Sequence, residues 1–481
     1  MFPSLKKRGS LELTQSDAKM NKSLEAALSI ALNSGRSKDS FWLSRLLLER
    51  KVYKRHIFEA YINQLSNVGL KKEHVDFLAI VAQELPNDFF LHNVTAGLYG
   101  SLNMRDLSQQ FATKAAAIKP LSPSRILSKS NMNVLVLQTI SSGGYRYIPK
   151  SNRFLMPGIN ELYTFFDPHI KCHRLLVDSL DGVFKALGAL PPIDIVFNSI
   201  SDPDMTAALL KASVVCKYLN KPVINEPSKV IELARSTLHI KCINSEGVMA
   251  AKAIYLPPEQ TDESHIRTAM SKYDIKLPAI IRAAGFQGGQ HMVLACDIKQ
   301  DTNHLYRGNG LYIIEFIDVS FKHLHDQEGI FYPKYRAMFV GNKLIPVHLF
   351  VSDQYEVHRK TSYGMLDKFP WINDMEEDYI MNPAAHFPCG KWEQLEKKIA
   401  SFGLEFVGVD FALSSRPGDG HKIMIFECNP SMRNRLTYLP EGNRVQKNGM
   451  KQLWRPIIVF ALNPASLLGS SSLQNYKICV E

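Results

Sequence analysis

Two alternating apolar runs joined by a tight turn, at residues 406–430, constrain the fold of this chain more than any other stretch. The turn contains Pro417-Gly418-Asp419-Gly420, and the runs on both sides alternate as β-strands do. This pattern predicts a β-hairpin. The midpoint between positions 410 and 427 falls inside the turn, so we expect Asp410 and Glu427 to be cross-strand neighbours within one register step.

The predicted hairpin has one apolar and one polar face, because side chains alternate along a strand. Asn429 shares the face of Glu427, and the small residues Gly408 and Ala412 leave space beside Asp410. The opposite, core-facing side is expected to carry Val407, Val409, Phe411, Met424, Phe426 and Cys428.

The polar face offers a candidate metal site. Carboxylate and amide oxygens are the ligands that Mg²⁺ prefers in proteins. We therefore hypothesise that Asp410, Glu427 and Asn429 bind magnesium, with manganese as the alternative metal. The competing interpretation is an ordinary solvated hairpin face. Because the acids are expected on an exposed face, Asp410→Asn should weaken metal binding and leave the fold intact.

Composition narrows the class of protein. A chain of 481 residues has the length of about three domains, and 45% hydrophobic residues can build their cores. The net charge of +11 favours an anionic ligand, but the basic residues are scattered, which disfavours nucleic acid as a partner. The seven cysteines form no CxxC pair, so we expect reduced thiols in the cytoplasm. No apolar run is long enough to span a membrane, and the oligomeric state is not indicated.

The first part of the chain, 1–125, is predicted to be an all-α helical-repeat module. Apolar residues recur at helical spacing from about 22 to 119, with breaks near 33–35, 68–69, 85–87 and 102–103. Residues 88–120 resemble a tetratricopeptide helix pair, in which a small residue lets the two helices approach. Such modules bind peptides or partner proteins, and simple scaffolding is the alternative.

A Ser/Pro linker at 121–125 precedes a change to α/β structure. A buried strand at 133–140, a helix near 170–188 and a second strand at 193–200 make one parallel crossover, and a third short strand ends at Asn225. Asn198, Asp202 and Asp204 follow the second strand, where open parallel sheets bind ligands. Turn formation and capping are the alternative role for these three residues.

The next segment places cations beside a glycine-rich turn. We expect a helix that contains Arg235 and a strand near 251–256. Arg282 interrupts an apolar strand directly before a glycine-rich hairpin tip at 285–290, which can fold backbone N–H groups over phosphates. A strand at 311–318 then ends in acidic residues. Further strands at 335–340 and 344–351 flank a Gly341-Asn342 turn, and a helix at 392–402 leads into the first hairpin.

The order of these parts resembles the ATP-grasp superfamily from about 131 to 440, and the Asp410, Glu427 and Asn429 pattern is similar to the magnesium-binding residues of D-alanine ligases and glutamate-adding ligases. The resemblance implies a chain of the α/β class, in which a Rossmann-like lead domain precedes an α+β ATP-grasp domain. Its parts would be a lead domain at 131–230, a small subdomain at 231–318 and a large subdomain at 319–481 that holds the metal site.

The resemblance also implies roles in nucleotide binding. Arg235 and Arg282 stand where the superfamily usually has two phosphate-binding lysines, and arginine keeps the charge with a different geometry. Arg336 matches the strand arginine that faces the transferred phosphate, and Arg433 lies where the substrate pocket begins. Arg282, Arg336 and Arg433 are the predicted catalytic residues. The remaining nucleotide contacts are implied at Gly285, Gln287, Gly288, Gly289, Glu315, Phe316, Ile317 and Asp318.

The implied activity is an ADP-forming carboxylate–amine ligation through an acylphosphate, with ATP and magnesium and with an amino acid or peptide as substrate. Two alternatives stay open: a phosphotransferase of the same superfamily, and a non-catalytic nucleotide-dependent scaffold, which the two arginine replacements favour. His348 and His358 are candidates for substrate contact or for structural roles. His323 and His325 form a His-x-His that is more typical of a solvated loop than of a soft-metal site.

Overall fold

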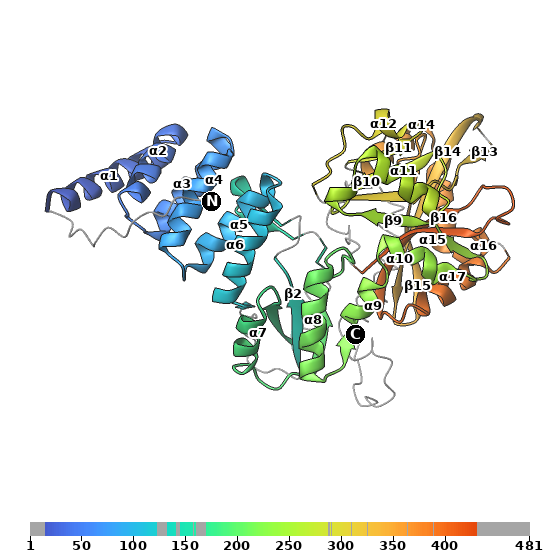
Figure 1. Cartoon of the computed structure of the whole chain (residues 1–481), viewed down its shortest axis with the longest axis horizontal. Helices are drawn as coiled ribbons and strands as arrows, with labels where there is room; N and C mark the ends of the chain where they lie inside the picture. Colours follow the sequence, from blue (N-terminus) through green and yellow to red (C-terminus); the bar gives the residue numbers. More distant parts are fainter. Residues whose placement is uncertain are drawn as a thin grey trace. The chain divides into compact units, whose positions relative to one another are not determined.

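The computed structural model describes residues 15–122, 132–140, 145–156, 158–159, 170–286, 289, 291–308, 310–324, 326–362, 364–387 and 389–430 (Figure 1). The chain divides into two compact units, Met1–Ile118 with Gly143–Pro157, and Lys119–Ser142 with Gly158–Glu481. A helical module followed by α/β structure confirms the predicted fold class. Division of the second unit at 230/231 and 318/319 stays a prediction. None of the described helices is long and apolar enough to cross a membrane.

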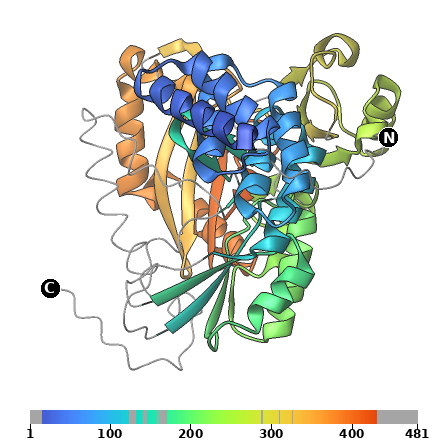
Figure 2. The ribbon, with the colours of Figure 1, turned by 90° about the vertical axis from the view of Figure 1, so that its left-hand side faces the viewer.

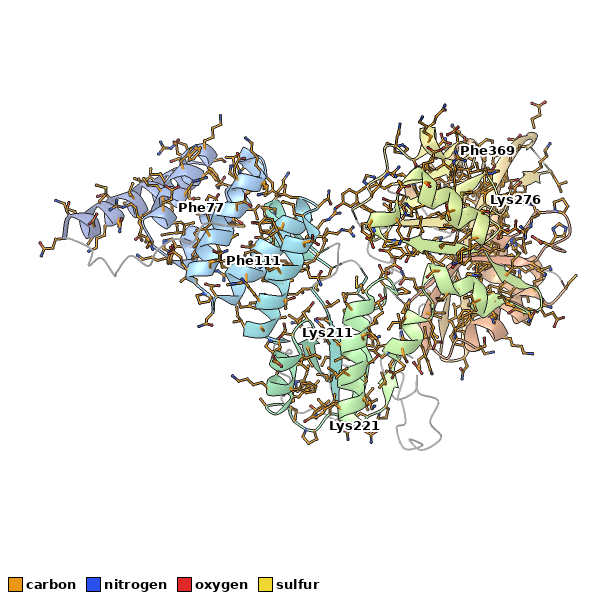
Figure 3. All side chains as sticks on the ribbon, in the orientation of Figure 1. Phe77, Phe111, Lys211, Lys221, Lys276 and Phe369 are labelled. Atoms are coloured by element: carbon orange, nitrogen blue, oxygen red, sulfur yellow. The ribbon has the colours of Figure 1, made fainter. Side chains whose placement is uncertain are left out.

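The first unit is built from six consecutive helices. They are α1 (Gln15–Asn33), α2 (Ser37–Glu49), α3 (Arg55–Val68), α4 (Lys72–Glu84), α5 (Phe89–Ser101) and α6 (Arg105–Ile118). The four predicted breaks are confirmed. A further break lies between α2 and α3, at residues 50–54, which contain neither glycine nor proline. Phe111, labelled in Figure 3, is one of the buried side chains that hold α6 against α5.

A short hairpin from later in the chain also belongs to the first unit. It consists of β3 (Arg146–Ile148), the 3₁₀ turn Pro149–Ser151 and β4 (Arg153–Leu155). A Cβ atom on Gly97 of α5 would lie 2.8 Å from the backbone nitrogen of Tyr147, so the glycine admits the hairpin. The Tyr145 hydroxyl donates to Asn93 Oδ1 at 2.5 Å. The glycines of this predicted helix pair therefore serve the hairpin, and a tetratricopeptide-like role for the module stays a prediction.

The second unit begins with a five-stranded sheet. Its order is β1 (Leu121–Ser122), β5 (Ile170–Leu176), β2 (Met132–Gln138), β6 (Ile195–Asn198) and β7 (Val223–Ile224), and all pairs except β1–β5 are parallel. The predicted helix over 170–188 is wrong in its first half. Residues 170–176 form β5, because parallel pairing with β2 outweighs the irregular pattern of its basic residues, and only α7 (Leu180–Leu187) is helical. Helix α8 (Thr206–Leu219) follows β6.

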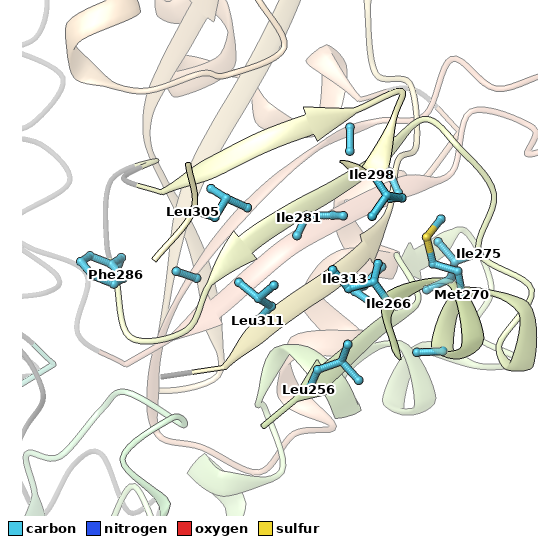
Figure 4. Packing of buried hydrophobic residues seen from close by; sticks show 14 residues of the cluster. Leu256, Ile266, Met270, Ile275, Ile281, Phe286, Ile298, Leu305, Leu311 and Ile313 are labelled. Atoms are coloured by element: carbon cyan, nitrogen blue, oxygen red, sulfur yellow. The ribbon is translucent and has the colours of Figure 1, made fainter. Parts of the chain in front are cut away.

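A four-stranded antiparallel sheet follows, in the order β11 (Met292–Ala295), β10 (Ala279–Ala283), β12 (Leu311–Glu315) and β9 (Ala253–Leu256). One face of this small sheet packs against α11 (Glu263–Lys272) through a cluster that includes Ile281, Ile313 and Ile266 (Figure 4). Because alternate residues point to opposite faces, Arg282 and Tyr312, which are register partners, lie on the other face.

A six-stranded sheet forms the last layer. Its order is β13 (Phe321–His323), β14 (Asp326–Val340), β16 (Phe406–Leu413), β17 (Ile423–Asn429) and β8 (Val248–Ala250), and β15 (Lys343–Ser352) also pairs with β14. The long strands β14 and β15 are seen from a second side in Figure 2. Both predicted hairpins are confirmed, with Gly341 and Asn342 in left-handed conformations at the β14–β15 turn.

Short helices connect these layers. Two precede the small sheet, namely α9 (Pro227–Ile231) and α10 (Arg235–Cys242), and α12 (Ile298–Asp301) follows β11. The others are α13 (Arg359–Ser362), α14 (Met365–Lys368), α15 (Trp371–Met381), α16 (Pro383–His386) and α17 (Lys391–Ala400). Phe411 of β16 lies in an aromatic cluster with Tyr379 of α15 and Trp392 of α17, so these helices cover the core-facing side of the large sheet.

Candidate functional site

A row of four polar residues crosses the large sheet. Asp410 of β16 pairs directly with Glu427 of β17, as the turn position predicted. On its other side, Asp410 pairs with Arg336 of β14, and Arg336 pairs with His348 of β15. Directly paired residues point to the same face of a sheet, so the row presents two acids and two basic side chains on one surface.

A β-bulge changes which residues share that surface. Asp410 pairs with Glu427, but the next residue, Phe411, pairs with Ile425, so Phe426 is an extra residue in β17. The bulge shifts the side-chain alternation by one. The predicted core face is therefore right for Val407, Val409, Phe411 and Cys428 and wrong for Met424, which pairs with Ala412 on the acid-bearing side. Phe426 packs against the same cluster as Met424.

Asp410 is buried, which contradicts the expectation of an exposed acid. The residue is 2% exposed, and its two oxygens accept hydrogen bonds from Nε and Nη2 of Arg336, each at 2.6 Å. Lys334 Nζ lies 3.9 Å from Asp410 Oδ2. Burial alone would lower the pKa of Arg336, but the Asp410 carboxylate outweighs it and raises that pKa.

Arg235 links the second acid of the row to the five-stranded sheet. It opens α10, and its Nη2 donates to Glu427 Oε2 at 2.5 Å while Nη1 lies 3.4 Å from Asp204 Oδ2. The Tyr312 hydroxyl donates to Asp204 Oδ1 at 2.6 Å. Burial would lower the pKa of Arg235, and its acidic neighbours, Glu427 first, raise it instead. Asp204 follows β6, so one of the predicted strand-end acids joins the site.

Asp202 and Asn198 take more local roles. Asp202 Oδ1 accepts the backbone N–H of Asp204 at 3.0 Å, and burial together with the Asp204 charge raises the pKa of Asp202 to about 6. Asn198 donates through Nδ2 to the carbonyl oxygen of Asn225 at 2.9 Å and accepts the N–H of Ile200. The turn-forming alternative therefore describes both residues, because each accepts the N–H two residues further on, and Asp202 thereby supports the loop that carries Asp204.

Arg282 is the cation of this site without a bound carboxylate. Its Nη2 donates to the carbonyl oxygen of Phe286 at 2.5 Å, and no acid among the described residues forms an ion pair with it. Burial and repulsion from Arg235 lower its pKa to about 10. A partly buried cation held by one carbonyl beside a second arginine is a position that an incoming anion would stabilise.

The glycine-rich turn beside Arg282 is described only in part. Gly285 and Gly289 have left-handed φ angles of 72° and 75°, as a tight tip requires, whereas Gln287 and Gly288 lie outside the described residues, as do His325 and Arg433. A Cβ atom on Gly289 would lie 3.1 Å from Cδ2 of His358, so Gly289 lies close to the segment that follows β15. His358 Nε2 lies 3.1 Å from Glu356 Oε1, so both side chains lie beside Gly289.

The predicted hinge joins the small and large sheets. Glu315 accepts a hydrogen bond from Arg416 Nη1 at 2.8 Å, and the carbonyl oxygen of Asp318 accepts the N–H of Ser415 at 2.9 Å. Phe316 lies edge-on to Tyr355, with ring centroids 6.5 Å apart. Ile317 is 5% exposed and packs in the cluster that contains Met424 and Ala412.

Sequence reasoning missed four residues that the structure places here, namely Lys334, Tyr312, Tyr355 and Arg416. A signal existed for two of them. Lys334 stands two residues before Arg336 on the same strand, and therefore on the same face. Arg416 directly precedes the turn of the first hairpin, but only the fold brings that turn to Glu315. Tyr312 and Tyr355 had no sequence signal.

Asp410, Glu427 and Asn429 offer the oxygen donors that magnesium prefers. Asp410 and Glu427 are adjacent across the hairpin, and Asn429 pairs with Gly408 two residues further along the strands. Glu427 uses Oε2 for Arg235, and its Oε1 has no hydrogen-bond partner among the described residues. The described residues hold no group of three His, Cys, Asp or Glu that could hold a metal, so the hypothesis depends on two acids and an amide. His323, of the predicted His-x-His pair, stacks on the ring of Trp371 with the ring centroids 3.9 Å apart.

Comparison with known proteins finds similarity in structure only. No protein-family model and no curated protein matches the chain. The chain is similar to the L-amino acid ligase from Bacillus licheniformis, with a TM-score of 0.35 and 9% identity over 63% of this chain and 67% of that one. It is also similar to the D-alanine–D-alanine ligase from Coxiella burnetii, with a TM-score of 0.38 and 8% identity over 69% of this chain and 95% of that one. A third similar structure is that of the ATP-grasp ligase PsnB, with a TM-score of 0.34 and 10% identity over 70% of this chain and 100% of that one.

Proposed function

We propose that this protein is an ATP-dependent, ADP-forming ligase that joins a carboxylate to an amine through an acylphosphate, with an amino acid or a peptide as substrate. One observation carries the proposal. Arg235 from α10, Arg282 from β10 and Arg336 from β14 gather around the Asp410–Glu427 pair, and Arg282 has no acidic partner among the described residues. Several cations beside two acids suit a polyphosphate with its counterion.

The three arginines have different tasks in this proposal. Arg282 binds phosphate oxygens, because no described carboxylate forms an ion pair with it. Arg336 is oriented by its two hydrogen bonds to Asp410 and faces the transferred phosphoryl group. Arg235 holds Glu427 and Asp204 together. Magnesium bound to Asp410, Glu427 and Asn429 would neutralise phosphate charge during transfer.

The proposed reaction has two steps. A substrate carboxylate oxygen attacks the γ-phosphorus of ATP, the bond to the β-phosphate oxygen breaks, and ADP leaves. A neutral amine then attacks the acyl carbon, phosphate leaves, and the nitrogen loses a proton. The intermediate must be kept from water. The close approach of Gly289 to Glu356 and His358 supports exclusion of water beside that residue.

Product analysis tests the proposal. Wild type and Glu427→Gln would be incubated with magnesium-ATP and a panel of amino acids and peptides, and ADP, free phosphate and product mass would be measured. A ligase gives ADP, free phosphate and a condensed product in wild type only. A phosphorylated product without free phosphate would show a phosphotransferase. If both proteins bind magnesium-ATP equally and neither consumes it, the enzymatic proposal fails.

A further inference from the structure

Helix α8 is apolar on two faces. Its inner face carries the buried residues Ala208, Leu209, Ala212, Val215 and Cys216. Its outer face carries Leu210, Val214 and Tyr218, which are 57%, 44% and 65% exposed. A surface helix normally turns charged or polar residues outward, and a row of large exposed apolar residues marks an interaction site. The outer face therefore needs a different explanation from the inner one.

The exposed residues form one continuous ridge. Leu210, Val214 and Tyr218 are spaced four residues apart, so they lie on neighbouring turns over about 12 Å. Phe184 of α7 extends the ridge sideways, because its ring meets that of Tyr218 edge-on with centroids 5.0 Å apart and it is itself 38% exposed. Ridges with a spacing of four pack best against the same kind of ridge on another helix.

The charges around the ridge select the partner. Lys185, Lys217 and Lys221 are exposed, and none of them forms an ion pair with a described residue. Helix α8 has no acidic residue, and Asp181 is the single acid of α7. In Figure 3, Lys211 and Lys221 mark the first half and the end of this helix. A second copy of the same face would bring lysines against lysines, which disfavours self-association.

We propose that the Leu210–Val214–Tyr218 ridge with Phe184 is a docking surface for an acidic amphipathic helix of a partner protein. The partner helix places apolar residues at a spacing of four on the ridge and acidic residues opposite the lysines. The proposal does not depend on the chemistry proposed above, because none of its residues belongs to the arginine and carboxylate site.

Peptide binding tests the proposal directly. The probe is a fluorescein-labelled synthetic helix with leucines at a spacing of four and glutamates elsewhere, and its control carries lysines in place of the glutamates. With the full chain in about 0.1 M salt, anisotropy should detect the acidic peptide and not the basic one. Lys217→Glu should weaken binding severalfold and Tyr218→Ala more strongly, whereas Lys276→Glu, an exposed lysine of the small-sheet region, should change nothing.

Three results would overturn the proposal. The acidic and basic peptides could bind equally, or Tyr218→Ala and Lys217→Glu could both bind the acidic peptide as wild type does. Sedimentation could instead show a dimer that Tyr218→Glu dissociates, which would make a second copy the occupant. Lys217→Glu guards against misfolding as an explanation, because it changes only a surface charge. Magnesium-ATP binding, measured on the same variants, should stay unchanged and so separates this proposal from the proposed activity.

Discussion

At the scale of single residues, the two acids of the hairpin are held in different ways. Asp410 is almost fully buried and has both oxygens on Arg336, whereas the Glu427 side chain is 27% exposed and gives one oxygen to Arg235. A buried carboxylate that holds a partly buried guanidinium is part of the fold as well as of the site. Asp410 is therefore expected to matter for stability, and Glu427 mainly for ligand binding.

Asp410→Asn should destabilise the protein, which reverses the expectation from the sequence. The amide cannot balance the charge of Arg336, and breaking one side of a buried ion pair costs roughly 3–5 kcal/mol. Urea unfolding measures the effect, with Glu427→Gln as the more exposed control at a much smaller cost. Replacing both partners in Asp410→Leu/Arg336→Met should recover part of the loss. A stability of Asp410→Asn equal to that of wild type would contradict the burial of this pair.

Asp202→Asn should stabilise the protein at neutral and alkaline pH. Burial and the Asp204 charge raise the pKa of Asp202 from 3.8 to about 6, so ionising it disfavours the folded state above that pH. The penalty is absent below the unfolded pKa and grows as the pH rises to about 6, where it amounts to about 3 kcal/mol at most. Asparagine removes the charge and can still accept the Asp204 N–H.

Urea unfolding of Asp202→Asn and wild type at about pH 8 and pH 4.5 checks the sign of this effect. The variant should be more stable at the higher pH, and the difference should shrink at the lower one. Asp181→Asn, an exposed acid of α7, serves as the matched control. If Asp202→Asn were less stable than wild type at about pH 8, the ionised carboxylate would be contributing favourably to the fold.

At the scale of elements, the bulge in β17 is the feature that the sequence could not reveal. Turn chemistry at 417–420 was enough to set the Asp410–Glu427 pairing, because a hairpin register follows from its turn. One extra residue, Phe426, then moved Met424 to the opposite face. A bulge depends on twist and packing against neighbouring strands, which alternation of apolar residues does not encode.

Gly97→Ala in α5 should destabilise the first unit, although the same change normally strengthens a helix by about 1 kcal/mol. A Cβ atom at this position would lie 2.8 Å from the Tyr147 backbone nitrogen, so the β3–β4 hairpin must move. Hydrogen exchange should show faster exchange in 145–155. Gly364→Ala is the control, because open space surrounds that position. Unchanged exchange in the hairpin would mean that this packing contributes little.

At the scale of the whole molecule, the candidate site is assembled from segments far apart in the sequence. The order of strands and glycine turns was enough to predict an α/β chain behind a helical module, since periodicity and turn residues are local signals. Arg235 pairs with Asp204 across 31 positions and with Glu427 across 192, and Arg416 pairs with Glu315 across 101. Such contacts depend on how the sheets pack against each other, so no local sequence pattern predicts them.

Calorimetric titration of magnesium-ATP into the full chain tests most directly whether Arg282 binds the phosphates of magnesium-ATP, as proposed. Arg282→Met should keep the fold, because it removes a charge that no described acid balances, and should weaken binding by about tenfold to a hundredfold. Arg267→Met, an exposed arginine of α11, should bind as wild type does. Equal affinity of wild type and Arg282→Met for magnesium-ATP would contradict the claim.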